Sequence, residues 1–245
     1  MPFGTEPLFR DDAYLRHCAA SVLAVNERGG VILDRTVFYA TSGGQPGDTG
    51  RLLIDGRAIA IGATVYGDDK TELVHVPAEQ GSLPSAGAPL TAELDWGRRY
   101  SHMRMHTALH LLCSLIPFPV TGGSIGADES RLDFDISDAG AVDKDEIAER
   151  LNALVAADHA VSTRWITDEE LADNPTLVRT MSVKPPSGTG RVRLVAIGPN
   201  GAVDIQPCGG THVRSTGEIG RLAVTKIEKK GRQNRRIRLA FAAPS

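Results

Sequence analysis

The spacing of hydrophobic and polar residues changes near residue 95, and this change divides the chain into two predicted regions. Before that point, short runs rich in β-branched residues alternate with turn-forming residues, as in a small β-barrel. Asp55-Gly56 lies between two of these runs and is a dipeptide typical of a two-residue type I′ hairpin, because both of its residues must adopt positive φ. The predicted strands cover residues 21–25, 31–39, 51–54, 58–65, 72–76 and 90–94.

The second region opens with a predicted helix over residues 96–116. The segment 77–89 before it is rich in Pro, Gly and Ser, so we place the domain boundary just beyond this loop, near Asp95. Asp95 is placed to cap the helix and Pro117 to end it. Its apolar stripe consists of Met105, Leu109, Leu112 and Ile116.

Helices and strands are mixed in the rest of the chain. A second helix is predicted over residues 143–158, where Asp143 and Glu146 have the spacing of a capping box. Its predicted buried face consists of Ile147, Leu151, Leu154 and Val155, and further strands are predicted at residues 192–197, 202–205, 221–227 and 236–241. The predicted fold class is α+β: an N-terminal small β-barrel (residues 1–95) followed by an α+β domain (residues 96–245) with helices packed on an antiparallel sheet.

Composition adds a cellular setting to this picture. The 245 residues are 41% hydrophobic and 23% charged, as in soluble globular proteins. No run approaches the roughly 18 apolar residues of a membrane helix, and the first residues lack a signal-peptide pattern, so we expect a cytoplasmic protein with no membrane partner. Three cysteines are too few for a disulfide framework, so each is expected to be buried, reactive or a metal ligand.

The charge distribution is uneven although the net charge is only −3. That net charge argues against indiscriminate coating of nucleic acid, but it allows a local basic patch. One acid, Glu228, stands among seven basic residues near the C-terminus: Lys226, Lys229, Lys230, Arg232, Arg235, Arg236 and Arg238. Either a nucleic-acid contact or an ordinary solvated pair of strands would produce this pattern.

Two histidines four residues apart, His106 and His110, lie on the first predicted helix. This spacing puts them one turn apart on one face, which suits two ligands of a single metal ion. His102 lies one turn earlier and Cys113 nearly one turn later, so the helix alone does not decide which residues bind.

A second metal-binding pattern is Cys208-Gly209-Gly210-Thr211-His212. Glycines let the backbone fold back, so Cys208 and His212 are able to converge on one ion. The two patterns together supply three nitrogens and one sulfur, a set that zinc accepts and hard cations do not. Four protein ligands are typical of structural zinc, whereas catalytic zinc keeps a position open, and the sequence leaves this choice undecided.

The segment 41–50 is dense in glycine and lies between two predicted strands. Such a loop is able to bring backbone amides close to a phosphate or sugar, but it also suits a plain turn, and it lacks the Lys-Ser/Thr ending of a P-loop. His17, Cys18, His75 and His159 are expected to have no direct catalytic role, and Cys113 is expected to be a core residue.

Together these motifs resemble the alanyl-tRNA editing proteins of the AlaX family, which are similar to the editing domain of alanyl-tRNA synthetase. The resemblance covers residues 5–9, 43–50, 106–110, 121–126, 131–134, 208–212 and 216–220. It is closest to the medium-length form of the family, because a Gly-rich barrel is present without an aminoacylation domain. The family's Gly-rich motif often has three glycines, and here Ser42 stands in place of the first.

The resemblance implies a trans-editing hydrolase that deacylates mischarged alanine tRNA, with serine as the leading substrate and glycine second. It implies one zinc ion held by His106, His110, Cys208 and His212. The expected partner is tRNA, through the alanine acceptor stem and the 3′ aminoacyl end, with no requirement for ATP or another nucleotide substrate. The oligomeric state is left open.

Roles for the remaining site residues follow as hypotheses. Water is expected to attack the ester in a pocket floored by Gly209, Gly210 and the helix of His106. Thr107 and Gln45 are candidate catalytic partners of the substrate hydroxyl or the water. Expected substrate-binding residues are Gly43, Gly44 and Asp48 in the glycine-dense segment and Arg191, Arg193, Lys229 and Arg235 along the acceptor stem.

Two other classes of protein remain under consideration. A zinc protease is disfavoured because His-Thr-Ala-Leu-His lacks the Glu that serves as general base in His-Glu-x-x-His enzymes. A non-catalytic RNA-binding module with a structural zinc site is the stronger alternative, since it agrees with a four-ligand count. Turnover of a charged tRNA distinguishes it from an enzyme.

Overall fold

The computed structural model describes residues 4–68, 71–136, 142–179, 190–231 and 233–243. The chain forms two compact units, Met1–Tyr100 and Ser101–Ser245. We call them the barrel unit and the C-terminal unit. Helix α1 (Trp96–Leu115) begins in the first and continues in the second.

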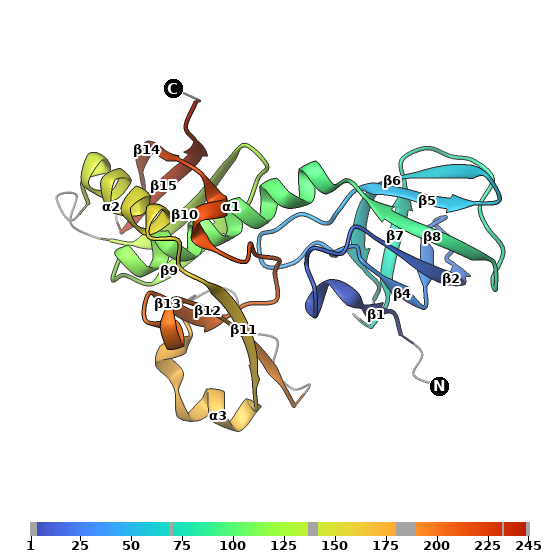
Figure 1. Ribbon diagram of the computed structural model, residues 1–245, viewed down its shortest axis with the longest axis horizontal. Helices are drawn as coiled ribbons and strands as arrows, with labels where there is room; N and C mark the ends of the chain where they lie inside the picture. Colours follow the sequence, from blue (N-terminus) through green and yellow to red (C-terminus); the bar gives the residue numbers. More distant parts are fainter. Residues whose placement is uncertain (1–3, 69–70, 137–141, 180–189, 232, 244–245) are drawn as a thin grey trace. The chain divides into compact units, whose positions relative to one another are not determined.

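The barrel unit is a closed barrel with strand order β2-β3-β7-β6-β5-β8 (blue to blue-green in Figure 1). Apolar side chains fill it, among them Val22, Leu33, Phe38, Leu52 and Ile61. The predicted barrel is confirmed, and Asp55 and Gly56 form the predicted hairpin turn with φ of 46° and 73°. The strands are β2 (His17–Val25), β3 (Val31–Leu33), β5 (Gly50–Ile54), β6 (Arg57–Tyr66), β7 (Leu73–Pro77) and β8 (Pro89–Leu94).

One predicted strand of the barrel unit is wrong in its extent. Residues 31–39 form β3 and then the short β4 (Arg35–Thr36), which pairs in parallel with β1 (Glu6–Pro7). Asp34 separates the two because its carboxylate accepts hydrogen bonds from the backbone N–H groups of Ser21 and Arg35. A side chain that binds backbone amides in this way replaces the regular ladder of a sheet.

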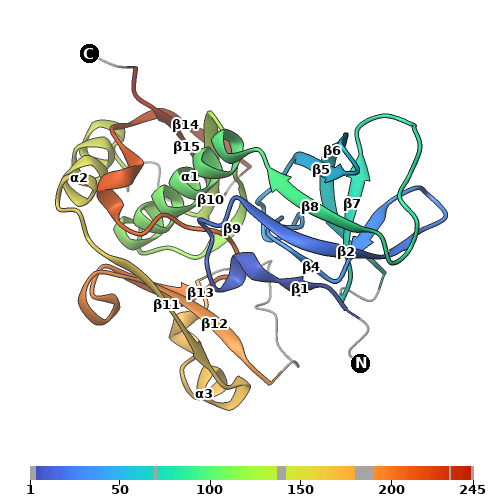
Figure 2. The same ribbon diagram turned by 45° about the vertical axis from the view of Figure 1, so that its right-hand side comes forward.

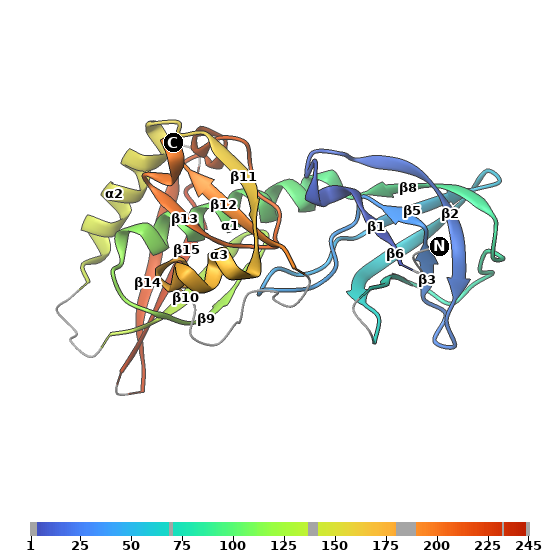
Figure 3. The same cartoon turned by 90° about the horizontal axis from the view of Figure 1, so that it is seen from below.

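The C-terminal unit contains two antiparallel sheets and three α-helices in its described residues. The four-stranded sheet has the order β14-β15-β10-β9, and its long β14–β15 hairpin is seen in red beside β10 in Figure 3. The three-stranded sheet has the order β11-β12-β13, with β11 in yellow beside β12 in orange in Figure 2. The strands are β9 (Val120–Ser124), β10 (Glu129–Asp135), β11 (Val161–Ile166), β12 (Val192–Ile197), β13 (Asp204–Pro207), β14 (Leu222–Lys230) and β15 (Asn234–Phe241).

The helices of the C-terminal unit pack through the predicted apolar positions. All four residues of the predicted stripe are buried: Met105, Leu109 and Leu112 lie in α1, and Ile116 directly follows it. Helix α2 (Lys144–Ala156) begins after Asp143, whose carboxylate accepts from the backbone N–H groups of Asp145 and Glu146. The buried face of α2 lacks only Leu154, which is half-buried. No α-helix within the described ranges is long and apolar enough to cross a membrane.

Three strands and one helix of the C-terminal unit were not predicted. Strand β9 contains two glycines, and β11 exposes four of its six residues, so neither has an apolar alternation. The third is β10, where buried Leu132 and Phe134 alternate with charged residues, a pattern that does indicate a strand. Helix α3 (Asp168–Asp173) is too short to have a clear helical period.

Candidate metal centre

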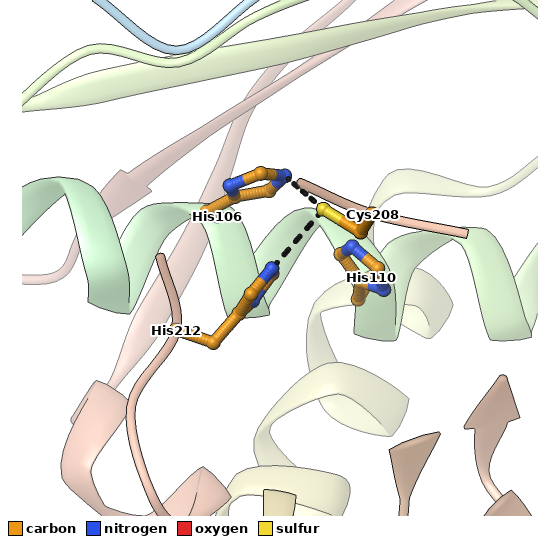
Figure 4. Close-up of side chains that lie close together, drawn as sticks. All are labelled: His106, His110, Cys208 and His212. Atoms are coloured by element: carbon orange, nitrogen blue, oxygen red, sulfur yellow. Dashed lines mark hydrogen bonds between the residues drawn. The ribbon is translucent and has the colours of Figure 1, made fainter. Parts of the chain in front are cut away.

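Four side chains converge in the C-terminal unit: His106 and His110 from α1, Cys208 just after β13, and His212 from the segment that follows (Figure 4). We call them the metal cluster. Each offers one ligand atom, and these atoms all lie within 4.8 Å of one another. Three of the residues are buried and Cys208 is half-buried. The cluster is therefore able to bind a metal ion.

Two of the distances within the metal cluster are close to those around a tetrahedral ion. The Sγ atom of Cys208 lies 3.5 Å from Nε2 of His106 and 3.3 Å from Nε2 of His212. Ligand atoms on tetrahedral zinc are about 3.3–3.6 Å apart, given its bond lengths to nitrogen and sulfur. The residues present thus fit such an ion with little rearrangement.

Thr107 fixes the orientation of His212. Its hydroxyl is buried and donates to the backbone oxygen of Met103 at 2.9 Å. With its hydrogen used there, Oγ1 accepts from Nδ1–H of His212 at 3.1 Å and from the backbone N–H of Val213 at 3.3 Å. His212 is therefore held with its Nε2 lone pair facing the cluster. Contact of Thr107 with a substrate hydroxyl or a water stays a prediction.

Asp204 and Gln206 fix the orientation of His110. Neither residue was predicted from the sequence. Nδ1 of His110 donates to Oδ2 of Asp204 at 2.8 Å, and Nε2 of Gln206 donates to the same oxygen at 2.9 Å. All three side chains are buried. A sequence signal exists, because two polar residues at alternate positions of a strand form one polar face.

The electrostatics of the metal cluster favours a thiolate at Cys208 and a neutral imidazole at His212. Burial alone would raise the pKa of Cys208, but the positive field and hydrogen bonds of the surrounding histidines hold it well below its usual value. Burial, followed by the charge of His106, lowers the pKa of His212. Against burial, the hydrogen bond to Asp204 and the Cys208 thiolate raise the pKa of His110 to about 10 in the metal-free protein. A thiolate and a neutral imidazole bind a metal ion as they stand, whereas His110 has to release its second ring proton when a metal ion binds.

Arg193 supports the turn after Cys208. Its Nη1 atom donates to the backbone oxygens of Cys208 and Gly210 at 3.0 and 2.9 Å, and its side chain is buried. A contact of Arg193 with an acceptor stem stays a prediction, and these two backbone oxygens compete with it for the guanidinium. Gly209 is exposed, and a Cβ atom built there has no neighbour within 4 Å, so the turn does not require glycine at that position.

The other candidate ligands of the sequence lie outside the metal cluster. His102 and Cys113 are buried on α1, and burial raises the pKa of the Cys113 thiol to about 12. His75 is fully buried in the barrel unit, where its two ring nitrogens contact Thr36 at 2.8 Å and the backbone oxygen of Val31 at 3.0 Å. It is thus a core histidine with both ring nitrogens in hydrogen-bonding contact. That it has no direct catalytic role stays a prediction.

The glycine-dense segment of the barrel unit forms a tight turn. Ser42 and Gln45 pair through both backbone hydrogen bonds, while Gly43 and Gly44 take φ of 56° and 81°. Ser42 has an ordinary backbone conformation, so the turn needs no glycine there. Gln45 is fully buried, whereas Gly43 and Gly44 are exposed. Catalysis by Gln45 and substrate contacts of the two glycines stay predictions.

Asp48 has a structural partner in the barrel unit. Its carboxylate is buried and accepts from the guanidinium of Arg99, with Nε at 2.9 Å from Oδ2, and from the backbone N–H of Tyr39 at 2.6 Å. Arg99 also donates to the backbone oxygens of Ala13 and Val37. The predicted substrate contact of Asp48 has these interactions as competitors.

The basic run of the C-terminal unit is less available than its sequence indicates. Arg235 is buried, whereas Arg191 and Lys229 are exposed. Substrate contacts of these three residues stay predictions. Arg232 lies outside the described residues. Acidic partners neutralise three of the six basic residues of this run that the structure describes: Arg236 pairs with Asp133, Arg238 with Glu129 and Glu228, and Lys226 with Glu228. Cross-strand pairing between β10, β14 and β15 brings these acids to the bases.

Replacing Asp204 by Asn is expected to weaken metal binding about 10–100-fold, because the neutral amide is a poorer acceptor for Nδ1–H of His110. Competition with a zinc-sensitive chelator measures the dissociation constant. Asp143→Asn is the control, since Asn caps α2 as well as Asp does and the dissociation constant should not change. An unchanged dissociation constant for Asp204→Asn would show that His110 needs no anionic partner.

Comparisons with known proteins relate the chain to tRNA synthetases and to alanyl-tRNA editing proteins. Residues 192–238 match the family model of the threonyl and alanyl tRNA synthetase second additional domain, and residues 14–98 match that of the class II (A) tRNA synthetases. The chain is 34% identical over 244 residues to the alanyl-tRNA editing protein AlaX-M of Methanosarcina mazei, covering 95% of both chains. It is 36% identical over 247 residues to AlaX-M of Methanosarcina acetivorans, covering 95% of this chain and 97% of that one.

The same relationship extends to a synthetase. The alanine–tRNA ligase of Pyrobaculum arsenaticum is 35% identical over 235 residues, which are 92% of this chain and 25% of the ligase. These similarities define a relative of the second additional domain of threonyl and alanyl tRNA synthetases and of alanyl-tRNA editing proteins. The chain belongs to the AlaX-M family of alanyl-tRNA editing proteins, which confirms the resemblance seen in its motifs.

Proposed function

We propose that this protein is a zinc-dependent deacylase that hydrolyses Ser-tRNA(Ala), and less readily Gly-tRNA(Ala), in the cytoplasm without ATP. The observation that carries the proposal is the buried cluster of three imidazoles and one thiolate in a chain of the AlaX-M family. Soft sulfur with imidazole nitrogen favours zinc over magnesium or calcium. Bound zinc would supply a Lewis acid for the ester or an anchor for the substrate.

The residues of the chain prepare the site before any substrate arrives. Thr107 and Asp204 fix the two imidazole tautomers, and Arg193 fixes the turn that carries Cys208. These three are positioning residues. Exposed Gly209 leaves space beside the half-buried thiolate, where a substrate is able to approach. The attacking water would lose a proton, and the 3′ oxygen of the tRNA would gain one as the ester breaks.

Such an enzyme is useful because the synthetase selects its amino acid imperfectly, and a second site is then needed to hydrolyse the wrong products. A synthetase pocket shaped for alanine does not strongly exclude the smaller glycine, and it rejects serine only by about a hundredfold. An editing site that hydrogen-bonds the serine hydroxyl disfavours alanine by about 10⁴, because alanine leaves its buried polar groups unpaired. Selective hydrolysis of Ser-tRNA(Ala) with Ala-tRNA(Ala) spared is therefore expected.

The test is to incubate the protein with separately prepared Ser-, Gly- and Ala-tRNA(Ala), with and without a zinc chelator, and to follow release of the amino acid. Zinc-dependent loss of serine or glycine supports the proposal and ranks the substrates. Binding of all three without hydrolysis would favour the non-catalytic RNA-binding module with structural zinc, which the four-ligand cluster also suits.

Salt is expected to slow deacylation at low tRNA concentration, since phosphate contacts release counterions. Lys229→Gln should reduce the slope of log(kcat/KM) against log[salt] by about 1, because Lys229 is exposed. Arg236→Gln is the contrast: Asp133 already neutralises Arg236, so the slope should stay unchanged. A rate independent of salt would contradict an electrostatic contact with the acceptor stem.

A further inference from the structure

Trp165 on β11 is an exposed aromatic residue that is not part of the metal cluster. Its exposed fraction is 42%, and it is the aromatic one among the four large hydrophobic residues that are exposed in the described part of the chain. Residues 162–164, which precede it on the strand, are exposed as well. An indole at an exposed sheet edge is available to a ligand.

The register of the three-stranded sheet places Trp165 in line with the metal cluster. Trp165 on β11 is the cross-strand partner of Arg193 on β12. The backbone oxygen of Arg193 accepts from the N–H of Cys208 at 3.0 Å. Cys208 directly follows β13 and therefore lies opposite Arg193, on the side of β12 away from Trp165. Two strand spacings make the backbones of Trp165 and Cys208 about 10 Å apart, a distance that one nucleotide bridges.

Trp165 also lies on the face of the sheet that carries the metal cluster. Cross-strand partners point to the same face, so the indole shares the face of the Arg193 side chain. That guanidinium reaches the backbone oxygens of Cys208 and Gly210. Asp204 and Gln206, which hold His110, pair with Ile197 and Val195, at alternate positions from Arg193 and hence on the same face.

The guanidinium of Arg191 lies beside the indole of Trp165. The guanidinium carbon of Arg191 lies 5.8 Å from the ring centroid of Trp165, and Arg191 itself is exposed. An aromatic face beside an arginine is the combination that binds unpaired nucleotides, because the ring stacks on a base while the cation contacts phosphate.

We propose that Trp165 is the stacking platform for the base of the 3′-terminal nucleotide of the charged tRNA, and that Arg191 contacts a phosphate of the same end. Stacked there, the nucleotide presents its aminoacyl ester to the metal cluster on the same face. The platform rests on the proposed function, because it takes the charged 3′ end of a tRNA as its ligand. A base-stacking contact is sequence-tolerant, so the platform would hold the end without reading the acceptor stem.

Tryptophan fluorescence tests the platform without any catalytic step. The chain has two tryptophans, and Trp96→Phe leaves Trp165 as the only one. The probe is a CCA trinucleotide whose 3′ end carries serine through a stable amide. Saturable quenching of Trp165 is expected. No quenching, or a fluorescence change that depends only on protein concentration and so indicates self-association, would overturn the platform.

Deacylation provides the second readout. Trp165→Ala is expected to raise KM for Ser-tRNA(Ala) about tenfold with a smaller effect on kcat, and Trp165→Phe should restore most of the affinity. Arg164→Gln is the matched control, because residue 164 is exposed on the same strand but points to the opposite face. Wild-type deacylation with an unchanged KM in Trp165→Ala would remove the platform but leave the proposed function. Quenching by the trinucleotide without any deacylation would keep the platform and remove the proposed function.

Discussion

Replacing Cys208 by Ser is expected to abolish stoichiometric zinc binding and to lower deacylation of Ser-tRNA(Ala) by about 10³-fold or more. Cys208 supplies the one anionic ligand of the metal cluster, and its low pKa keeps it a thiolate. A serine hydroxyl stays protonated at neutral pH and is a poor zinc ligand. Loss of the metal removes several kcal/mol of transition-state stabilisation, which corresponds to a factor of this size.

Elemental analysis of the purified variant measures zinc, and circular dichroism checks that it is folded. Cys113→Ala is the matched control, since Cys113 is a buried thiol on α1, the helix of His106 and His110, but lies outside the metal cluster. It should keep its zinc and most of its activity, at the cost of a small loss in stability. A folded Cys208→Ser protein with full deacylase activity and no zinc would exclude the metal from the reaction.

The sequence was informative about the metal cluster because ligand spacing is a local property. His106 and His110 are one helical turn apart in any helix, and Cys208 and His212 lie on one short segment. That these two pairs meet is a tertiary fact, supported beforehand by the preference of zinc for such a ligand set and by the resemblance to the AlaX family. The supporting residues were missed for the same reason. Asp204 reaches His110 only because β13 packs beside α1, a contact between residues 94 positions apart.

The charge of a residue in the sequence was the weakest basis for predicting contacts with a ligand. The basic residues of β14 and β15 stand beside acids of β10 and β14, and these pairings depend on register, which local sequence does not reveal. Arg193 was predicted to face a tRNA, yet it is turned inward to the backbone of the metal-binding turn. A cation in a sequence indicates charge, but burial decides whether that charge is available to a ligand.

The same lesson applies to Asp48 in the barrel unit. In the sequence, a carboxylate among glycines suggested a contact with the substrate. In the structure, Asp48 and Arg99 form an ion pair with side chains 1% and 0% exposed. A structural role follows from this burial, and it gives a large expected effect on stability.

Replacing Asp48 by Ala is expected to destabilise the barrel unit by about 3–5 kcal/mol, because it leaves the guanidinium of Arg99 buried without its counter-ion. The N–H of Tyr39 loses its acceptor as well. Urea unfolding followed by circular dichroism measures the change, read from the transition of the barrel unit since a two-unit chain need not unfold in one step.

The barrel unit contains its own control for this effect. Arg51 and Glu93 form a bidentate pair of the same chemistry, with Arg Nη2 2.8 Å from Glu Oε1, but its side chains are 54% and 36% exposed. Glu93→Gln should therefore change the free energy of unfolding by no more than about 1 kcal/mol, since solvent screens the pair. If Asp48→Ala is equally mild in its effect on unfolding but removes deacylation of Ser-tRNA(Ala), the ion pair is dispensable to the fold and Asp48 acts on the substrate. A large loss of stability instead means that the carboxylate holds the first turn of α1 to the barrel, and that any effect on editing passes through that structure.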